Sequence, residues 1–379
     1  MNRVHLDHNA TTPLRPEARA EFLRAADALS GNPSSVHASG RSARAELDDA
    51  RERIAAALEV EGEELIFTSG GTEANNAAIF GGLPQGAPLY VGALEHSSVG
   101  EAAEALRQAG RQVHTLPVDS AGRLDLVASK ACLEDQKGGL LSVMAANNEL
   151  GTVTPLEGLR ALLASLPAPF RPLWHADCVQ MLGKLPVSPR ELGLELASFS
   201  AHKVGGPLGV GLLWRAKSAA LSPRLVGGGQ ESGMRSGTEN LPAIAAAAVA
   251  IELAVAEQKT YAERTAALTR GFWKEIQTAI PAAQLLGPPI ESADRLPNTL
   301  CVLLPGADGR VLVPRLDLEG LEVSAGSACS SGSIEPSPVL LALGHSQVEA
   351  RAALRLSLGR ETSAEDLQVA IKVLGKTCG

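Results

Sequence analysis

The chain has 379 residues, which is long enough for two or three folding units with a sizeable core. Hydrophobic residues make up 45% and charged residues 20%, and the formal net charge of −8 argues against a nucleic-acid-binding surface. No signal peptide is predicted, because no basic segment precedes an apolar stretch near the start. The most apolar run, Ala243–Ile251, is too short to span a bilayer, so no membrane association is expected.

Predicted strands and helices alternate through the first two thirds of the chain. Apolar residues at three- and four-residue spacing predict amphipathic helices at Leu14–Leu29 and Ser42–Leu58. Short apolar runs predict five strands, at Glu64–Thr68, Leu89–Ala93, Leu140–Ala145, Pro172–Ala176 and Leu196–Ser200. Helical stretches separate most of them, such as Val99–Ala109 and Leu156–Leu166. This alternation predicts βαβ units and a mostly parallel sheet.

The pattern changes after a helix predicted around Pro242–Glu257. A polar helix and a turn-rich segment follow, at Lys259–Ile280 and Pro281–Pro297. The remaining predicted elements are a strand, a helix, a strand-like run and a closing helix, at Thr299–Leu304, near Val311–Leu316, at Leu321–Ser324 and from Ala364. We predict a large domain at residues 14–258 and a smaller α/β domain formed by residues 1–13 and 259–379.

The five cysteines are scattered, and no two of them form a CxxC pair: Cys132, Cys178, Cys301, Cys329 and Cys378. Their odd number and spacing argue against a disulfide framework and against a zinc site. No metal is therefore expected, and a reducing, cytoplasmic location is favoured. Most isolated cysteines pack as small hydrophobic residues.

Polar clusters follow the five predicted strands of the first domain. They are Ser69-Gly70-Gly71-Thr72, Glu95-His96, Asn147-Asn148-Glu149, Asp177 with Gln180, and Ser200-Ala201-His202-Lys203. Ligands of open α/β sheets bind beyond the carboxyl ends of the strands. Five such clusters in succession are difficult to explain as solvated loops alone.

Each cluster by itself also has an ordinary structural explanation. Gly71 and Thr72 fit either a phosphate cradle at a helix N-terminus or a glycine-rich turn that Thr72 caps. A lone Lys203 would usually be a surface lysine, and a lone Asp177 would usually be a helix cap or an ion-pair partner. His96 is as easily a hydrogen-bonded structural histidine as a catalytic one.

Taken together, the clusters fit pyridoxal 5'-phosphate (PLP). This cofactor needs a lysine for a Schiff base, a carboxylate at its pyridinium nitrogen and a cradle for its phosphate. Lys203 supplies the amine and Asp177 the carboxylate, and the spacing between them leaves room for a crossover that brings both to one ring. The cradle is predicted at Gly71, Thr72, Ser200 and His202.

Ten segments in order along the chain carry a family resemblance: LDHNATTP (Leu6–Pro13), GNPSSVHASG (Gly31–Gly40), FTSGGTEANN (Phe67–Asn76), EHSSV (Glu95–Val99), NNELG (Asn147–Gly151), HADCVQ (His175–Gln180), SFSAHKVGGPLG (Ser198–Gly209), GGGQESGMRSGTEN (Gly227–Asn240), SAGSACSSGSIEPS (Ser324–Ser337) and LRLSLGR (Leu354–Arg360). They resemble the cysteine desulfurases of the NifS/IscS type, within the class V aminotransferase group of fold-type I PLP enzymes. The resemblance implies an α/β fold with a mostly parallel seven-stranded sheet in the large domain.

The resemblance also implies how PLP is held. Lys203 would bind the cofactor, Asp177 would pair with its pyridinium nitrogen, and Gln180 would contact the ring hydroxyl. His96 would stack on the ring and move protons. The phosphate would be held by Gly71, Thr72, Ser200 and His202.

Three further roles follow from the resemblance alone. Thr238 would reach a phosphate in the partner subunit, which implies a homodimer. Arg355 would clamp the carboxylate of the substrate, a task that suits its planar guanidinium. Asn148 would contact both the substrate and the edge of the PLP ring.

The sulfur chemistry depends on Cys329. The local sequence fits equally well a tight turn in which this cysteine only packs. A Gly/Ser-rich surrounding offers the freedom that a sulfur carrier needs, and the resemblance makes Cys329 the nucleophile. The implied activity converts L-cysteine to L-alanine and leaves the sulfur on Cys329 as a persulfide. The implied recipient is an acceptor protein, such as an iron–sulfur scaffold or a tRNA-thiolation enzyme.

The chain departs from the family pattern at two places, with Leu208 where the family reads GPKG and Ser232 in an ERG-like triplet. Cys378 is expected to be incidental and not a sulfur relay. Two other interpretations stay open. One is a selenocysteine lyase or another class V aminotransferase-like enzyme, which would not depend on Cys329 in the same way. The other is a sulfur-delivery or assembly partner with little turnover of its own.

Overall fold

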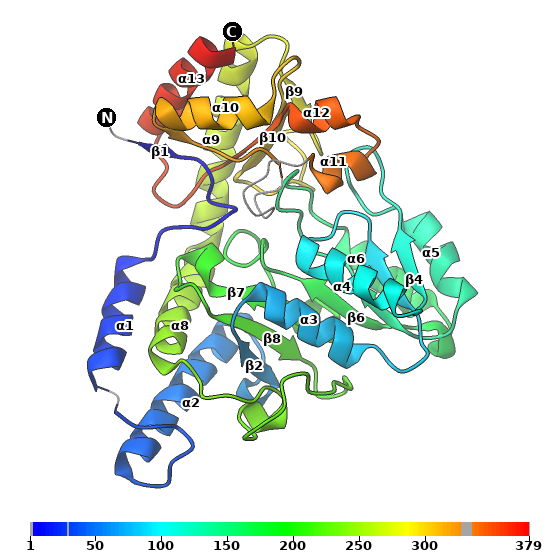
Figure 1. The fold of residues 1–379 in the computed structure, drawn as a ribbon, viewed down its shortest axis with the longest axis vertical. Helices are drawn as coiled ribbons and strands as arrows, with labels where there is room; N and C mark the ends of the chain where they lie inside the picture. Colours follow the sequence, from blue (N-terminus) through cyan, green and yellow to red (C-terminus); the bar gives the residue numbers. More distant parts are fainter. Residues whose placement is uncertain (1–2, 29, 327–335, 379) are drawn as a thin grey trace.

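The computed structural model describes residues 3–28, 30–326 and 336–378. Its largest feature is a seven-stranded sheet with the strand order β2-β8-β7-β6-β5-β3-β4 (Figure 1). The strands are β2 (Leu65–Thr68), β3 (Leu89–Gly92), β4 (Val113–Leu116), β5 (Leu140–Ser142), β6 (Leu173–Asp177), β7 (Leu196–Ser200) and β8 (Gly211–Arg215).

Five of these strands, β4, β3, β5, β6 and β7, run parallel to one another, while β8 is antiparallel to β7 and β2. The predicted α/β fold with a mostly parallel seven-stranded sheet is therefore confirmed. Sequence reasoning missed β4 and β8. The edge strand β4 is largely half-buried and contains His114 and Thr115, so it lacks an apolar run. The strand β8 follows a segment in which glycine and proline favour a loop.

Helices cover both faces of this sheet, as the burial of its strands on both faces requires. In chain order, the α-helices of this part are α1 (Pro16–Ala28), α2 (Ala38–Leu58), α3 (Gly71–Gly82), α4 (Ser97–Gln108), α5 (Leu126–Asp135), α6 (Leu156–Ser165), α7 (Pro189–Leu192) and α8 (Leu241–Ala256). Residues of α3 and α4 pack on one face, in a core with Leu89 and Leu196. Residues of α2, α6 and α8 pack on the other, in a core with Trp174 and Phe199.

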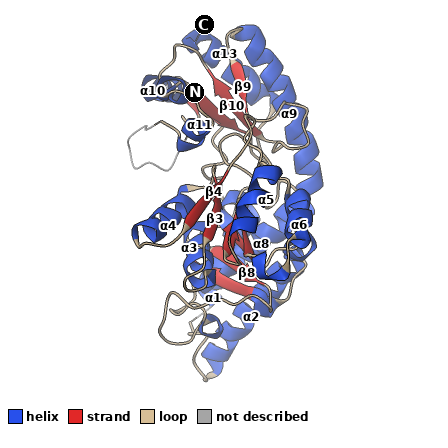
Figure 2. Cartoon of the chain, turned by 90° about the vertical axis from the view of Figure 1, so that its right-hand side faces the viewer, coloured by secondary structure: helices blue, strands red, loops and turns tan. Residues whose placement is uncertain are grey.

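A second, smaller sheet is antiparallel, with the order β12 (Ala353–Ser357), β10 (Thr299–Leu303) and β9 (Gln284–Leu286). Figure 2 shows it above β3 and β4, with α9 along one side. The strands β1 (Val4–His5) and β11 (Leu321–Glu322) pair in parallel. The helices of this part are α9 (Gln258–Ala279), α10 (Gly309–Leu318), α11 (Pro338–Ala342), α12 (Gln347–Arg351) and α13 (Ala364–Cys378).

The N-terminal residues pack with the C-terminal third of the chain. Val4 and Leu6 share one core with α9, β10, β12 and α13. This shared core supports our proposal that residues 1–13 and 259–379 form one domain and residues 14–258 the other. The chain then passes between the two parts, where Thr12 N donates to His202 O and Arg15 N donates to Gly205 O.

No single helix in the described ranges is long and apolar enough to cross a membrane. Among the described residues, one pair of consecutive helices, α8 and α9, reaches that length and composition together, and the two meet at a bend of 66°. Ten residues of α8, which matches the helix predicted around Pro242–Glu257, are buried inside the protein.

Candidate active site

One cavity of about 260 Å³ lies where the predicted clusters meet. This is several times the volume of a water molecule and leaves room for a small organic ligand. Ten of the predicted residues line it: Gly71, Thr72, His96, Asn148, Asp177, Gln180, Ser200, His202, Lys203 and Arg355. Thr238 is exposed and does not line it, and Cys329 lies outside the described residues. The carboxyl ends of the strands therefore converge on one site, to which β12 adds Arg355.

Asp177 ends β6 and is the buried carboxylate of the site, with 5% exposure. Its Oδ2 accepts a hydrogen bond of 2.7 Å from Asn75 Nδ2, and its Oδ1 accepts one of 2.9 Å from Val179 N. Asn75 also donates to Ser98 Oγ over 2.8 Å. Two donors hold the carboxylate in a fixed orientation. Sequence reasoning gave Asn75 and Ser98 no role, although both lie in quoted motifs and line the cavity.

The N-terminus of α3 forms one wall of the cavity. Its N-cap, Gly70, offers no side chain to the first backbone N–H groups, which are thus available to an anion. A Cβ on Gly71 would lie 2.9 Å from Val179 Cγ2, and a Cβ on Gly211 would lie 2.4 Å from the carbonyl carbon of Gly70. Glycine at both positions lets strand, turn and neighbouring loop approach this closely.

Two histidines line the same cavity. Burial and the nearby Lys203 lower the pKa of His202 to about 4, so its imidazole is neutral at neutral pH. His202 Nδ1 is 3.1 Å from Thr11 Oγ1. His96 is the N-cap of α4, and its Nδ1 accepts a hydrogen bond of 3.1 Å from Ser98 N. With Nδ1 as an acceptor, the ring proton of neutral His96 resides on Nε2.

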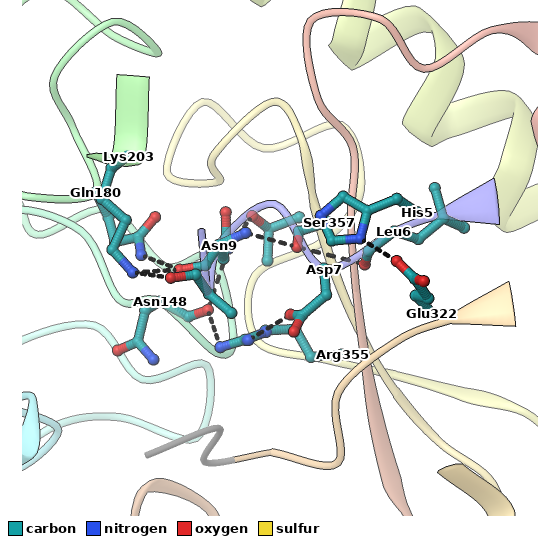
Figure 3. A network of polar contacts seen from close by, with 12 residues as sticks. His5, Leu6, Asp7, Asn9, Asn148, Gln180, Lys203, Glu322, Arg355 and Ser357 are labelled. Carbon is teal, nitrogen blue, oxygen red and sulfur yellow. Dashed lines mark hydrogen bonds and ion pairs between the residues drawn. The ribbon is translucent and has the colours of Figure 1, made fainter. Parts of the chain in front are cut away.

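The segment Leu6–Ala10 lies against the reacting groups (Figure 3). Lys203 Nζ donates to the carbonyl oxygens of Asn9 and Ala10, each over 2.7 Å. Gln180 Nε2 donates to the same Asn9 oxygen over 3.0 Å. Asn9 Nδ2 donates to Asn148 O over 3.1 Å. Sequence reasoning quoted this segment as a motif but assigned it no role, because its contacts with Lys203 and Gln180 are made by backbone oxygens.

Arg355 is 1% exposed and lies in β12. Its guanidinium pairs with Asp7 Oδ1 over 2.7 Å and donates to Asn148 O over 3.2 Å (Figure 3). Its Nε is buried and has no hydrogen-bond partner within the described ranges. Asp7 was not predicted, and it keeps the arginine charge paired inside the protein.

Two further titratable residues belong to the strands that end at the site: the half-buried Glu95, which follows β3, and the buried His175 in β6. Burial raises the pKa of Glu95 well above its usual range, and the charge of Asp177 raises it further. Glu95 Oε1 accepts a hydrogen bond of 2.8 Å from Met144 N. His175 joins three strands, since its Nδ1 is 2.8 Å from Ser142 Oγ and its Nε2 is 2.9 Å from Ser198 Oγ.

Burial lowers the pKa of His175 to about 3, which makes folding sensitive to acid. Between that value and the usual value near 6.5, the unfolded chain binds one more proton at this residue, so stability is lost as pH falls. We expect the unfolding free energy of His175→Gln to fall less steeply over this window, by up to about 1.4 kcal/mol per pH unit. Urea unfolding between pH 7 and pH 4 measures this slope. His345→Gln, on the smaller domain, serves as the control, and equal slopes for both variants would contradict the assignment.

The described part of the chain contains no cluster of metal ligands and no disulfide. Cys132, Cys178, Cys301 and Cys378 are free thiols there. Burial raises the pKa of each of them, and that of Cys301 reaches about 12. A thiol with a raised pKa holds little thiolate at neutral pH, so none of the four is an activated nucleophile.

Comparison with known proteins identifies the family. Residues 4–369 match the family model described as aminotransferase class-V. The chain is 40% identical over 375 residues to a protein named cysteine desulfurase IscS from Dictyoglomus turgidum, covering 98% of this chain and 93% of the relative. It is 41% identical over 380 residues to a cysteine desulfurase from Cereibacter sphaeroides, covering 99% and 95%.

Solved structures agree with this assignment. A NifS-like protein superposes with a TM-score of 0.90 at 33% identity and covers 99% of this chain and 98% of its own. SspA in complex with cysteine superposes with a TM-score of 0.76 at 28% identity, covering 93% and 98%. The chain thus belongs to the aminotransferase class-V family and, within it, to the cysteine desulfurases of the NifS/IscS type.

Proposed function

We propose that this protein is a PLP-dependent enzyme that converts L-cysteine to L-alanine and transfers the sulfur to Cys329. The observation that carries the proposal is the convergence of the Lys203 amine, the Asp177 carboxylate and the open N-terminus of α3 on one cavity. The family of the chain supports the same substrate, and the SspA structure is described as a complex with cysteine.

The residues around the cavity fit PLP. Asp177 presents a carboxylate held by two donors, which suits a protonated pyridine nitrogen. Gly71 and Thr72 begin α3, where backbone N–H groups and the helix dipole favour a phosphate, and Ser200 ends β7 next to them. Lys203 also lines the cavity, and His96 has the flat ring that would stack on the cofactor.

PLP supplies an electron sink that makes the Cα–H bond of a bound amino acid acidic. Lys203 takes and returns that proton, and His96 offers a second proton through Nε2. Asp177 keeps the ring nitrogen charged. Arg355 binds the carboxylate of the substrate, for which its bond to Asp7 must loosen or be shared. The Cys329 thiolate then forms an S–S bond to the substrate sulfur while the C–S bond breaks, and the remaining carbon skeleton takes up protons to become alanine.

We further propose a homodimer in which Thr238 of one subunit contacts the phosphate bound by the other. Its exposure and its absence from the cavity of its own chain are compatible with this arrangement. The persulfide would pass to an acceptor protein, such as an iron–sulfur scaffold or a tRNA-thiolation enzyme, in the cytoplasm. Cross-linking of Thr238→Cys to the opposite subunit would test the interface.

The deciding experiment is to incubate the PLP-loaded protein with L-cysteine and locate the added sulfur by peptide mass spectrometry. We expect one additional sulfur on the peptide that carries Cys329, together with an equal amount of alanine. Incubation with L-serine is the control, since it has no sulfur to transfer. Alanine without sulfur on Cys329, or sulfur only on another cysteine, would contradict the proposal.

A further inference from the structure

Lys184 is a buried lysine whose side-chain partners in the described part of the chain are neutral. It follows β6 by seven residues, its exposure is 5%, and its carbonyl is held by Gln258 Nε2 over 3.1 Å. Its Nζ donates to two amide oxygens, Asn9 Oδ1 over 2.8 Å and Gln180 Oε1 over 2.5 Å. Within the described ranges, no carboxylate lies within ion-pair distance of it. An ammonium buried in this way, with neutral partners only, would be costly.

The surroundings of Lys184 favour a neutral amine. Burial lowers the pKa of its ammonium well below the ordinary range, and the positive charges of Lys203 and Arg355 lower it further. A neutral amine still has two N–H groups, and two amide oxygens accept them. The hydrogen bonding of Lys184 is therefore complete without a charge. Lys184 also differs from Lys203 in position, because Lys203 lines the cavity of the candidate active site and Lys184 does not.

The amine of Lys184 fixes which way two side-chain amides point. Because it presents N–H groups, it selects the oxygen end of each amide. The nitrogen of Gln180 must then turn the other way, and it donates to Asn9 O over 3.0 Å. The nitrogen of Asn9 must turn away as well, and it donates to Asn148 O and Thr299 Oγ1 over 3.1 and 2.9 Å. Asn298 Nδ2 also donates to Asn9 Oδ1 over 3.2 Å, so the Asn9 amide keeps one donor without Lys184. The Gln180 amide, whose oxygen accepts from Lys184, could then rotate by half a turn at little steric cost.

These bonds connect Lys184 to the reacting groups. Gln180 lines the cavity, and Asn9 O also accepts from Lys203 Nζ. Lys184 itself does not line that cavity; it lines a small neighbouring cavity, to which Lys203 also contributes. We propose that Lys184 is a positioning residue, which keeps the N–H end of Gln180 available to the cofactor ring and holds the Asn9 carbonyl against Lys203. This inference rests on the proposed PLP site but on neither Cys329 nor turnover.

The test replaces Lys184 with methionine, which has a similar length and no N–H group. Gln180 Oε1 loses its donor, while Asn9 Oδ1 keeps the bond from Asn298 Nδ2, and the Gln180 amide is free to turn its oxygen toward the ring. A hydrogen-bond donor at the ring oxygen of PLP stabilises the deprotonated form of that oxygen. Loss of this donor therefore raises the pH midpoint of the visible absorption change of the PLP-loaded protein. We expect a rise of about 0.5 pH unit and a roughly tenfold weaker PLP dissociation constant, both measured without substrate.

A double-mutant comparison shows whether Lys184 acts through Gln180. Gln180→Leu alone should raise the same midpoint, and adding Lys184→Met to it should raise the midpoint no further. Lys372→Met, an exposed lysine on α13, is the control and should change neither the midpoint nor the affinity. Lys184→Gln keeps an N–H donor, so its midpoint should stay near that of the unmodified protein, and a raised midpoint in this variant would contradict the inference even if the methionine variant does not fold.

Two outcomes would overturn the inference. One is a lower unfolding free energy with an unchanged midpoint, which would make Lys184 a structural residue only. The other is an additive rise of the midpoint in the double variant, which would show that Lys184 acts independently of Gln180. Neither the midpoint nor the unfolding free energy depends on sulfur transfer. A protein without the proposed desulfurase activity would therefore not by itself produce either of these two outcomes.

Discussion

Replacing Lys203 with alanine is expected to lower alanine formation from L-cysteine by about 10²–10⁴-fold, the range typical for a residue that transfers protons during a reaction. The variant loses the amine that lines the cavity and donates to Asn9 O and Ala10 O. It should also lose the visible absorption of the lysine-bound cofactor. Alanine production, measured by amino-acid analysis of the PLP-loaded protein, tests the first point, and absorption spectroscopy tests the second.

Lys217→Ala is the matched control for this variant. Lys217 is an exposed lysine that pairs with Glu63, and it does not line the cavity. Its replacement should leave both the rate and the spectrum unchanged, because exposed ion pairs contribute little to stability. A Lys203→Ala protein that kept its visible band and more than a tenth of its rate would refute the role given to Lys203.

The second large effect is expected for Cys329→Ser. A serine hydroxyl is a far weaker nucleophile than a thiolate at neutral pH, so alanine formation from L-cysteine should fall to the level measured without enzyme. The bound cofactor should keep its visible absorption, because the residues that line the cavity are intact. Cys329 thus separates a desulfurase from other class V enzymes, which would keep their turnover in this variant.

Cys378→Ser provides the comparison. Cys378 ends α13, and burial raises the pKa of its thiol. We expect this variant to form alanine at the rate of the unmodified protein and to carry the persulfide on Cys329. Full activity of the Cys329→Ser protein, or a persulfide that disappears only with Cys378, would reassign the sulfur acceptor.

The sequence predicted those parts of the fold that depend on apolar periodicity. The strands at Leu89, Leu140 and Leu196 are continuous buried runs, so their positions followed from the pattern alone. The strand β12 was missed although it carries Arg355. It alternates apolar residues with a buried arginine and serine, whose burial is possible only because Asp7 and Asn9 pair with them.

The residues of the site divide in the same way, into those that a local sequence pattern predicts and those that depend on distant partners. Residue types with a known chemistry, such as Lys203 and Asp177, could be proposed from their places at strand ends. The roles of Asn75, Lys184 and Asn9 could not, since each acts through a hydrogen bond to another side chain or backbone atom far away in the sequence. No local pattern encodes such a pairing. Only the folded chain brings the two partners together.

The path of the first dozen residues has a practical consequence. The strand β1 is fixed to β11, and four residues later the carbonyl of Asn9 lies 2.7 Å from the Lys203 amine. An affinity tag or fusion partner that pulled β1 away from β11 would therefore displace a hydrogen-bond acceptor at the centre of the site. Preparations with a tag before β1 need a spacer between the tag and the strand. A comparison of the cofactor spectrum before and after tag removal would show whether catalytic measurements on the tagged protein can be used.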